Sequence, residues 1–142
     1  MIKEIFNPGK YTTKLSMALL LLRVVAGTFM LTHGTGKFLK LFSGDPVMFA
    51  DPFGLGATAS LALVVFSEVF CSILLILGIA TRMVAIPLMI TMLVAAFIAH
   101  AADGFGKQEL PLLYAVIYMV LAVCGAGIFS LDKLIYEKIS RN

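Results

Sequence analysis

Two ionisable residues lie deep inside apolar stretches, where a charge needs a partner or water. Arg23 follows Leu15 by eight positions, and Glu68 precedes Ile79 by eleven positions in a stretch that runs the opposite way. At 1.5 Å per helical residue, both would lie about 12–16 Å from the same membrane surface. The sequence therefore predicts a buried Arg23–Glu68 ion pair, because a guanidinium fork suits two-point contact with a carboxylate. Such a pair could serve chemistry or merely fix helix packing, and both readings stay open.

A second polar group is expected near the opposite membrane surface. His33 and Lys37 are four residues apart and therefore share a helix face, while His100 ends another apolar stretch and Glu109 precedes the last one. Histidine titrates near neutral pH, which favours proton handling or hydrogen bonding. Metal binding is the less favoured alternative, because no ligand spacing joins the two histidines.

Tyr118 adds a hydroxyl at greater depth than Tyr114, which lies one helical turn before it. A buried phenol normally finds a hydrogen-bond partner, and Glu68 or Arg23 are the candidates. The predicted polar pocket comprises Arg23, His33, Lys37, Glu68, His100, Glu109 and Tyr118.

Known cofactor motifs are missing from the sequence. The two cysteines, Cys71 and Cys124, each lie in an apolar stretch, which is typical of packing rather than redox use. The sequence has no Rossmann fingerprint, no Cys-x-x-Cys-His for haem and no cysteine cluster for iron and sulfur. No metal site is predicted, and any electron transfer would have to use a quinone or a partner.

The elements that must position these residues are membrane helices. Of 142 residues, 61% are hydrophobic and 13% are charged, which excludes an ordinary soluble domain. Each of four apolar stretches has the length that crosses a bilayer as a helix. The prediction is an all-α, four-helix transmembrane bundle in one domain, residues 1–142, with spans at about 15–36, 58–79, 83–102 and 110–129.

The distribution of basic residues predicts the orientation of the bundle. One side carries Lys3, Lys10, Lys14, Arg82, Lys133, Lys138 and Arg141, and the other Lys37, Lys40 and Lys107. By the positive-inside rule both termini should be cytoplasmic. The long connection between the first two spans, 37–57, is then extracytoplasmic, and the amphipathic tail from Leu131 is expected to anchor at the interface.

Several short motifs, taken in order, resemble the DoxX family across nearly the whole chain. They are Arg23, His33-Gly34 with Lys37, Glu68 leading to Leu77-Gly-Ile-Ala-Thr-Arg82, His100, Gly125-Ala-Gly127 and Ser130-Leu-Asp132. The resemblance implies a small bacterial four-helix membrane protein. The family is named for similarity to a subunit of a thiosulfate:quinone oxidoreductase, and some members belong to redox-linked membrane complexes. Most members have no assigned reaction, so an architecture is implied more firmly than an activity.

The leading functional hypothesis is an inner-membrane subunit of a redox-linked system that binds a quinone or a small redox substrate in the polar pocket. Whether the chain is itself an oxidoreductase stays open. The alternative is a non-enzymatic scaffold that docks a membrane or periplasmic protein through the long connection. A small-molecule transporter ranks third, because no inverted repeat is visible. The expected partners are the bilayer and another protein, and a homo-oligomer stays open, whereas no basic run indicates nucleic acid.

Overall fold

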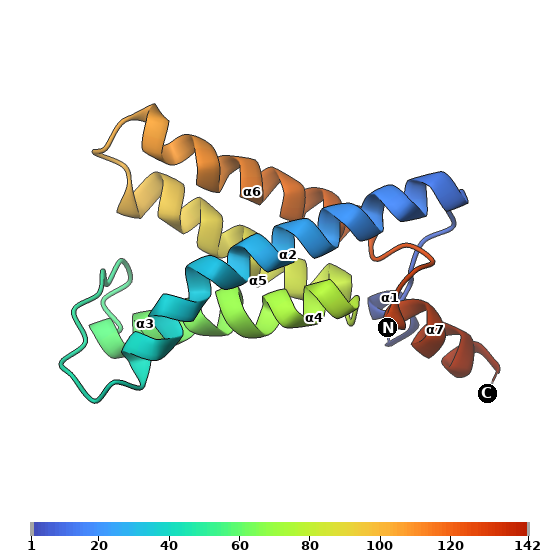
Figure 1. Ribbon diagram of the computed structural model, residues 1–142, viewed down its shortest axis with the longest axis horizontal. Coiled ribbons are helices and arrows are strands. Elements are labelled where there is room, and N and C mark those ends of the chain that lie inside the picture. The colour runs from blue at the N-terminus through green and yellow to red at the C-terminus, as the bar shows by residue number, and fades with distance from the viewer. Residues whose placement is uncertain (1, 142) are drawn as a thin grey trace.

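The computed structural model describes residues 2–141 and contains helices and connections without a strand in that range (Figure 1). The elements are α1 (Ile2–Ile5), α2 (Thr13–Leu41), α3 (Ala57–Val65), η1 (Phe66–Cys71), α4 (Ser72–Leu77), α5 (Thr81–Val94), η2 (Ala95–Ala99), α6 (Phe105–Cys124) and α7 (Leu131–Arg141). The segments η1 and η2 are π-helical and continue their neighbours, so α3–η1–α4 and α5–η2 are each one helical rod.

Four of these rods are long and apolar enough to cross a membrane: Thr13–Leu41, Ala57–Leu77, Thr81–Ala99 and Phe105–Cys124. Large apolar side chains cover their outer faces; Leu21 is 66% exposed, Phe97 61% and Val123 68%. A continuous exposed apolar surface of this kind is what a bilayer covers. The predicted all-helical class with four membrane-length helices is confirmed, and the chain is a multi-pass membrane protein.

Two of the predicted spans have different boundaries in the structure. The first helix continues past Gly36 to Leu41, because both Gly34 and Gly36 remain helical. The last crossing helix is shifted and ends at Cys124 rather than near 129. Gly125 and Gly127 follow with φ of 83° and 76°. Glycine adopts this left-handed backbone without steric strain, so the helix ends here.

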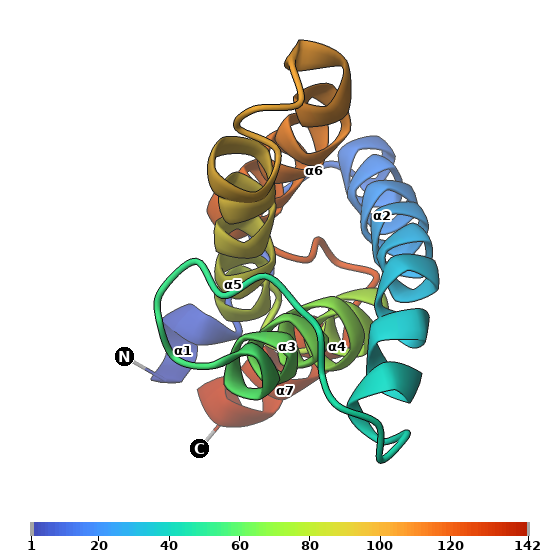
Figure 2. The same ribbon diagram turned by 90° about the vertical axis from the view of Figure 1, so that its left-hand side faces the viewer.

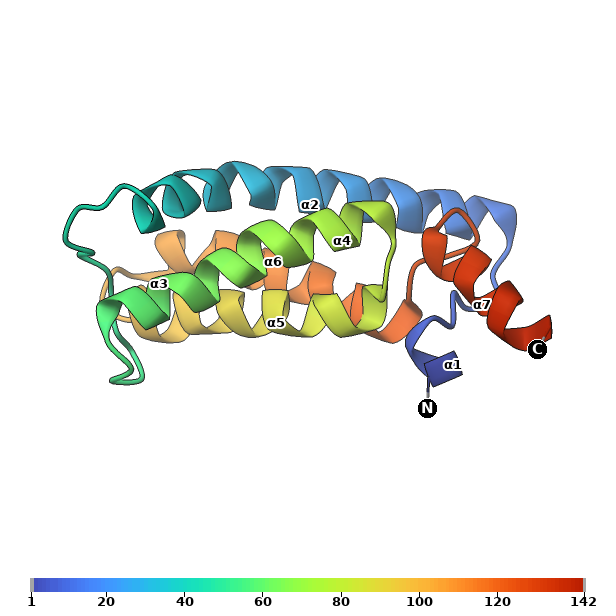
Figure 3. The same ribbon diagram turned by 90° about the horizontal axis from the view of Figure 1, so that it is seen from below.

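The four rods pack as two antiparallel pairs around one core. α5 lies along α6, and α2 lies along α3 and α4, whereas α2 meets α6 much less (Figure 2). The interior is filled by buried side chains from every rod, among them Met30, Leu75, Leu88 and Leu121. Both chain ends lie at one end of the bundle, called here the termini end, and the connection 42–56 lies at the other, the far end (Figure 3).

The termini end is closed by the segment between α6 and α7. Arg23, 1% exposed, donates from Nη1 to the carbonyl of Ala126 at 2.9 Å and from Nη2 to the carbonyl of Phe129 at 2.8 Å. Asp132 accepts from the backbone N–H groups of Ala80 at 2.6 Å and Thr81 at 3.0 Å, which caps the start of α5. These bonds fold the segment 125–132 back onto the bundle.

Arg82 completes this closure at the surface of the termini end. Its guanidinium donates to the carbonyls at the end of α6, including that of Cys124 at 3.1 Å, and to the carbonyl of Asn7 at 3.2 Å. A helix C-terminus leaves carbonyls without intrahelical partners, and a cation placed there satisfies them. The short motifs around Gly78–Arg82, Gly125–Gly127 and Asp132 therefore meet in one structural joint.

Candidate functional site

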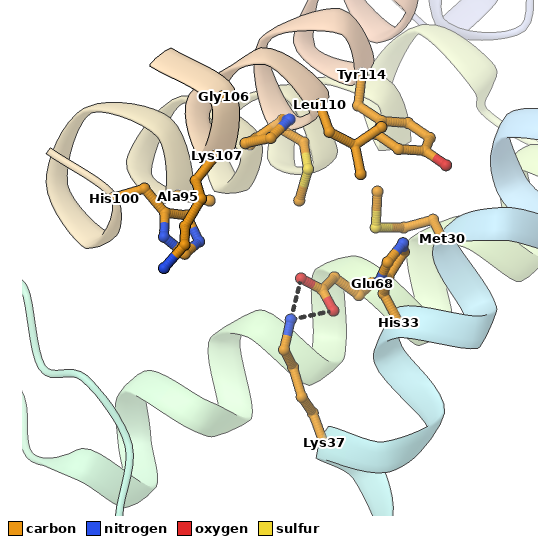
Figure 4. Close-up of a pocket in the computed structure, with 12 residues that line it drawn as sticks. Met30, His33, Lys37, Glu68, Ala95, His100, Gly106, Lys107, Leu110 and Tyr114 are labelled. Atoms are coloured by element: carbon orange, nitrogen blue, oxygen red, sulfur yellow. Dashed lines mark hydrogen bonds and ion pairs between the residues drawn. The ribbon is translucent and has the colours of Figure 1, made fainter. Parts of the chain in front are cut away.

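A cavity of about 310 Å³ lies in the far half of the bundle, where all four rods contribute to its wall (Figure 4). Its lining residues are Met30, His33, Lys37, Glu68, Met92, Ala95, His100, Gly106, Lys107, Leu110, Pro111 and Tyr114. Buried methionines and an aromatic ring form the inner wall, and charged or polar side chains face them. This combination of apolar walls with a few converging polar groups is typical of a small-molecule site.

The strongest polar feature of the cavity is an ion pair between α2 and η1. Lys37 Nζ lies 2.6 Å from both carboxylate oxygens of Glu68. The Glu68 side chain is 3% exposed, whereas the Lys37 side chain is 33% exposed. A buried carboxylate is costly without a countercharge, and Lys37 supplies one while leaving its third N–H without use in the pair. Glu68 is thus held as a charge-paired group at the cavity wall.

Close packing of α2 against η1 brings the pair together. A Cβ added at Gly34 would lie 3.0 Å from the backbone carbon of Glu68 and 2.8 Å from Val69 Cγ2, so only glycine permits this approach. Lys37 sits about one turn beyond Gly34, and helical side chains lean toward the N-terminus. The lysine therefore reaches back to the carboxylate.

Two of the four rods that border the cavity depart from regular α-helix beside it. Glu68 lies within the π-helical segment η1, and Ala95 begins the second such segment, η2, which ends just before His100. Wide turns of this kind occur mostly as single turns inside α-helices and are frequent at functional sites. They distinguish this half of the bundle from the regular helices at the termini end.

Aromatic side chains continue from the cavity into the core. The His33 ring meets the Tyr114 ring edge-on with centroids 6.4 Å apart, and Tyr114 stacks on Tyr118 at 6.0 Å. Tyr118 is fully buried, and its hydroxyl has no hydrogen-bond partner among residues 2–141. The expectation that Glu68 or Arg23 would satisfy this hydroxyl was wrong, because Glu68 is held by Lys37.

The turn before α6 forms the outer rim of the cavity. His100 Nδ1 lies 2.8 Å from Asp103 Oδ2, and Lys107 Nζ lies 3.6 Å from the same oxygen. The hydrogen bond with His100, followed by the charge of Lys107, holds the pKa of Asp103 below its usual value. This exposed cluster holds a carboxylate at the rim between two nitrogen-bearing side chains.

The structure divides the seven residues of the predicted pocket. His33, Lys37, Glu68 and His100 line the cavity, whereas Arg23, Glu109 and Tyr118 do not. Glu109 is exposed on α6, and Tyr118 lies behind Tyr114. Asp103, Lys107 and Tyr114 were missing from the prediction. His100, Asp103 and Lys107 lie close together in the sequence around the turn before α6, and that closeness could have indicated the rim cluster.

The predicted Arg23–Glu68 ion pair is wrong, because the helices pack in a different register. An added Cβ at Gly78 would meet Arg23 Nη1, whereas one at Gly34 would meet Glu68. Arg23 is therefore level with Gly78, at the end of α4, and not with Glu68. Its fork binds backbone carbonyls of the closing segment instead of a carboxylate.

Within residues 2–141 no three His, Cys, Asp or Glu side chains converge as metal ligands would. Cys71 is buried, Cys124 is half-buried, and both are free thiols. The chemistry that the cavity can support is hydrogen bonding and proton exchange through Lys37, Glu68 and the two histidines.

The order of these residues along the chain agrees with a known family. A protein-family model described as DoxX matches residues 18–101, more than half of the chain. The chain belongs to the DoxX family. The matched DoxX region runs from α2 to the turn after η2, so it contains the Lys37–Glu68 pair and both histidines, while Lys107 and Tyr114 on α6 lie beyond it.

Relatives of this DoxX chain occur in Haemophilus influenzae. One uncharacterized protein is 34% identical over 125 residues, which cover 82% of this chain and 90% of the relative. A second is 41% identical over 73 residues, which cover 49% of this chain and 48% of that protein. No solved structure matches the DoxX chain.

Proposed function

We propose that this DoxX protein is the membrane subunit of a redox-linked system, and that its cavity binds a quinone headgroup or another small carbonyl-bearing redox substrate. The observation that carries the proposal is the Lys37–Glu68 ion pair in the wall of a cavity inside a membrane bundle. Ionisable residues at membrane depth are costly and mark binding or proton pathways by default. Arg23 has a structural role, because it binds the segment that closes the termini end. The Lys37–Glu68 pair takes no part in that closure.

The donors around the cavity suit a carbonyl acceptor. Lys37 keeps one N–H after pairing with both carboxylate oxygens, and the His33 ring can present a second N–H. His100 donates its Nδ1–H to Asp103, so the Nε2 of its neutral ring is an acceptor. A cavity of about 310 Å³ lies at the lower end of the usual small-molecule range. The inner wall of Met30, Met92 and Tyr114 gives a planar ring apolar contact.

A quinone, when bound, supplies two-electron and two-proton chemistry. The residues of this chain bind and orient the ring and move protons at Glu68 Oε and the imidazole nitrogens. The sequence offers no motif for a resident electron carrier, so the proposal assigns the electron donor to a protein partner. The chain is accordingly a binding and proton-handling subunit.

The orientation belongs to the same proposal. The termini end carries Lys10, Lys14, Arg82, Lys133 and Lys138, and the far end carries fewer basic residues. The positive-inside rule then places both termini in the cytoplasm of a bacterial cell and the cavity toward the outer surface of the inner membrane. Cysteine labelling at Ser43 and at Ser140, with a reagent that cannot cross membranes, would test this; labelling of Ser140→Cys in intact cells would contradict it.

The binding test uses the purified protein in lipid nanodiscs. Titration with a ubiquinone headgroup should give saturable binding and raise the unfolding temperature, since a ligand that binds the folded state stabilises it. Lys37→Met and Glu68→Gln should weaken binding by about tenfold or more. Glu109→Gln is the matched control, because it makes the same carboxylate-to-amide change at an exposed position of the same end, and it should bind normally. Equal binding by all four proteins would reject the cavity as the site.

One observation favours a scaffold as the second candidate function. The connection 42–56 exposes large apolar side chains; Phe42 is 70% exposed, Met48 81% and Phe53 61%. None of its residues lines the cavity. Replacing residues 43–54 with a glycine-serine linker should abolish recovery of a membrane or periplasmic partner if the connection docks one. Unchanged recovery would reject this candidate.

A further inference from the structure

A second cavity, of about 250 Å³, lies beside the first, between α2 and α6. It is called here the lateral groove, and it is lined by Leu22, Val25, Ala26, Phe29, Leu110, Leu113, Tyr114 and Ile117. Apart from the Tyr114 phenol, every one of these side chains is apolar. The groove therefore has walls suited to a hydrocarbon chain and none suited to a charged group.

The lateral groove adjoins the polar cavity. Leu110 and Tyr114, both on α6, line both spaces. Polar groups such as Glu68 lie on one side of this shared wall, and apolar residues such as Phe29 lie on the other. The two neighbouring spaces are thus a polar compartment and an apolar compartment on either side of Leu110 and Tyr114.

The groove opens where a bilayer would lie. α2 and α6 touch each other far less than either touches its packing partner. Phe29 is 56% exposed, Leu110 51% and Leu113 58%, so the mouth of the groove is on the outer apolar face of the bundle. A molecule dissolved in the membrane could pass between these two helices without crossing an aqueous phase.

We propose that the molecule whose headgroup occupies the cavity carries an apolar chain, and that this chain lies in the lateral groove and leaves the bundle between α2 and α6. This inference rests on the function proposed above and narrows the ligand from any small redox substrate to a membrane-resident amphiphile. From Leu110 to Ile117 the groove follows α6 for about 10 Å at 1.5 Å per residue. Lipid is as apolar as the groove, so the groove selects by packing and access rather than by the hydrophobic effect.

The test compares a ubiquinone headgroup that bears a decyl chain with the same headgroup without it, in nanodiscs. Val25→Trp and Leu113→Trp fill the groove at positions that are 39% and 58% exposed, where a larger side chain is compatible with folding. Both should weaken binding of the decyl compound by about tenfold while changing binding of the bare headgroup by less than about twofold. Comparing each variant with the wild type cancels the greater partitioning of the decyl compound into lipid.

Matched controls lie on the same helices but outside the groove. Leu21→Trp on α2 and Val116→Trp on α6 are at exposed positions that do not line it, and both should bind the decyl compound normally. If the filling variants bind both compounds as the wild type does, the groove proposal is overturned while the cavity proposal stands. If the wild type binds neither compound, the proposed function fails and the groove proposal fails with it.

A second readout locates the chain directly. A decyl chain that ends in a photoreactive diazirine should label peptides within 22–29 and 110–117, and an excess of the unlabelled decyl compound should suppress that labelling. A phospholipid with the same diazirine is the competing occupant. If it labels the groove as strongly and the decyl compound does not suppress it, the groove is filled by bilayer lipid and the proposal is overturned.

Discussion

Arg23 and Gly78 lie so close together that a side chain at position 78 would clash with the Arg23 guanidinium. An added Cβ there would lie 2.5 Å from Arg23 Nη1 and 2.8 Å from Arg23 Cζ, and the backbone of Gly78 has φ of 70°. The carbonyl of Gly78 also accepts from the N–H of Asp132 at 2.8 Å. The position thus joins α4, the closing segment and the buried guanidinium.

Gly78→Ala should destabilise the protein by about 1–3 kcal/mol, because it adds a left-handed backbone strain and a steric clash with Arg23. Thermal unfolding in detergent measures the loss. Gly36→Ala is the control: an added Cβ at position 36 meets nothing within 4 Å, and the helix continues through it. This control should be neutral or slightly stabilising. Equal losses in the two variants would contradict the packing argument.

Arg23→Met should loosen the segment 125–132 while leaving the cavity intact. It removes the donor from the buried carbonyl of Ala126, at a cost of about 1–3 kcal/mol, and from the partly exposed carbonyl of Phe129, where water can replace it. Hydrogen exchange should rise in that segment and at the start of α5, and headgroup binding should change little in the protein that remains folded. A selective loss of binding without faster exchange would instead place Arg23 in the ligand site.

Lys37 and Glu68 should show strong coupling in a double-mutant cycle. Lys37→Met alone strands a carboxylate that is 3% exposed, so a loss of about 2–4 kcal/mol is expected, at the lower end because water reaches the lysine. Lys37→Met with Glu68→Gln removes both charges and should recover much of that stability. Additive losses, measured by thermal unfolding of all four proteins, would show that the two side chains do not interact.

Acid should loosen the connection before α3. Asp51 accepts from the Ser60 hydroxyl at 2.8 Å and from the N–H groups of Gly56 and Leu55, and these bonds hold its pKa below the usual value. A lowered folded-state pKa contributes stability above the unfolded pKa, near 3.9, that is lost as the pH falls through the folded value. Protection of the Leu55 and Gly56 amides, taken as their exchange rate relative to the intrinsic rate at each pH, should therefore fall below about pH 4.

Two variants distinguish this carboxylate from general acid effects. Asp51→Asn should already show fast exchange at neutral pH and little further change on acidification. Ser60→Ala removes the hydrogen bond that lowers the pKa of Asp51 most, so the loss of amide protection in this variant should occur at higher pH. An acid transition that is unchanged in both variants would assign the effect to another group.

Helix number and class could be predicted from the sequence, because apolar length alone identifies a membrane helix. The grouping of His33, Lys37 and His100 near one end also followed from their positions in the apolar stretches, whereas Glu68 was assigned to Arg23 near the opposite surface. The partner of each charged side chain could not be predicted in this way. Depth along a helix says how far a residue lies from its own boundary, and the prediction assumed that the first two helices begin and end at the same level. α2 in fact extends about 15 Å beyond the level of Gly78, from Arg23 back to Thr13.

Backbone acceptors were a second source of error. The buried guanidinium of Arg23 was matched with a carboxylate, since charge pairs can be read from a sequence. Its actual partners are the carbonyls of Ala126 and Phe129, and every residue has a carbonyl. The signal that could have pointed to them is the glycine-rich stretch 125–127, where the helix stops and its carbonyls become free to accept.

The π-helical segment η1 makes the cavity sensitive to chain length as well as to side-chain chemistry. A wide turn accommodates more residues than the same length of α-helix. Removing a single residue from Phe66–Cys71 would allow a regular helix to form there while α3 and α4 keep their positions, and it would turn the side chains inside the segment relative to α2. Glu68 would then lose its alignment with Lys37 although every polar residue was still present. A homologue that retains both residues but is one residue shorter between them is thus expected to lack the ion pair.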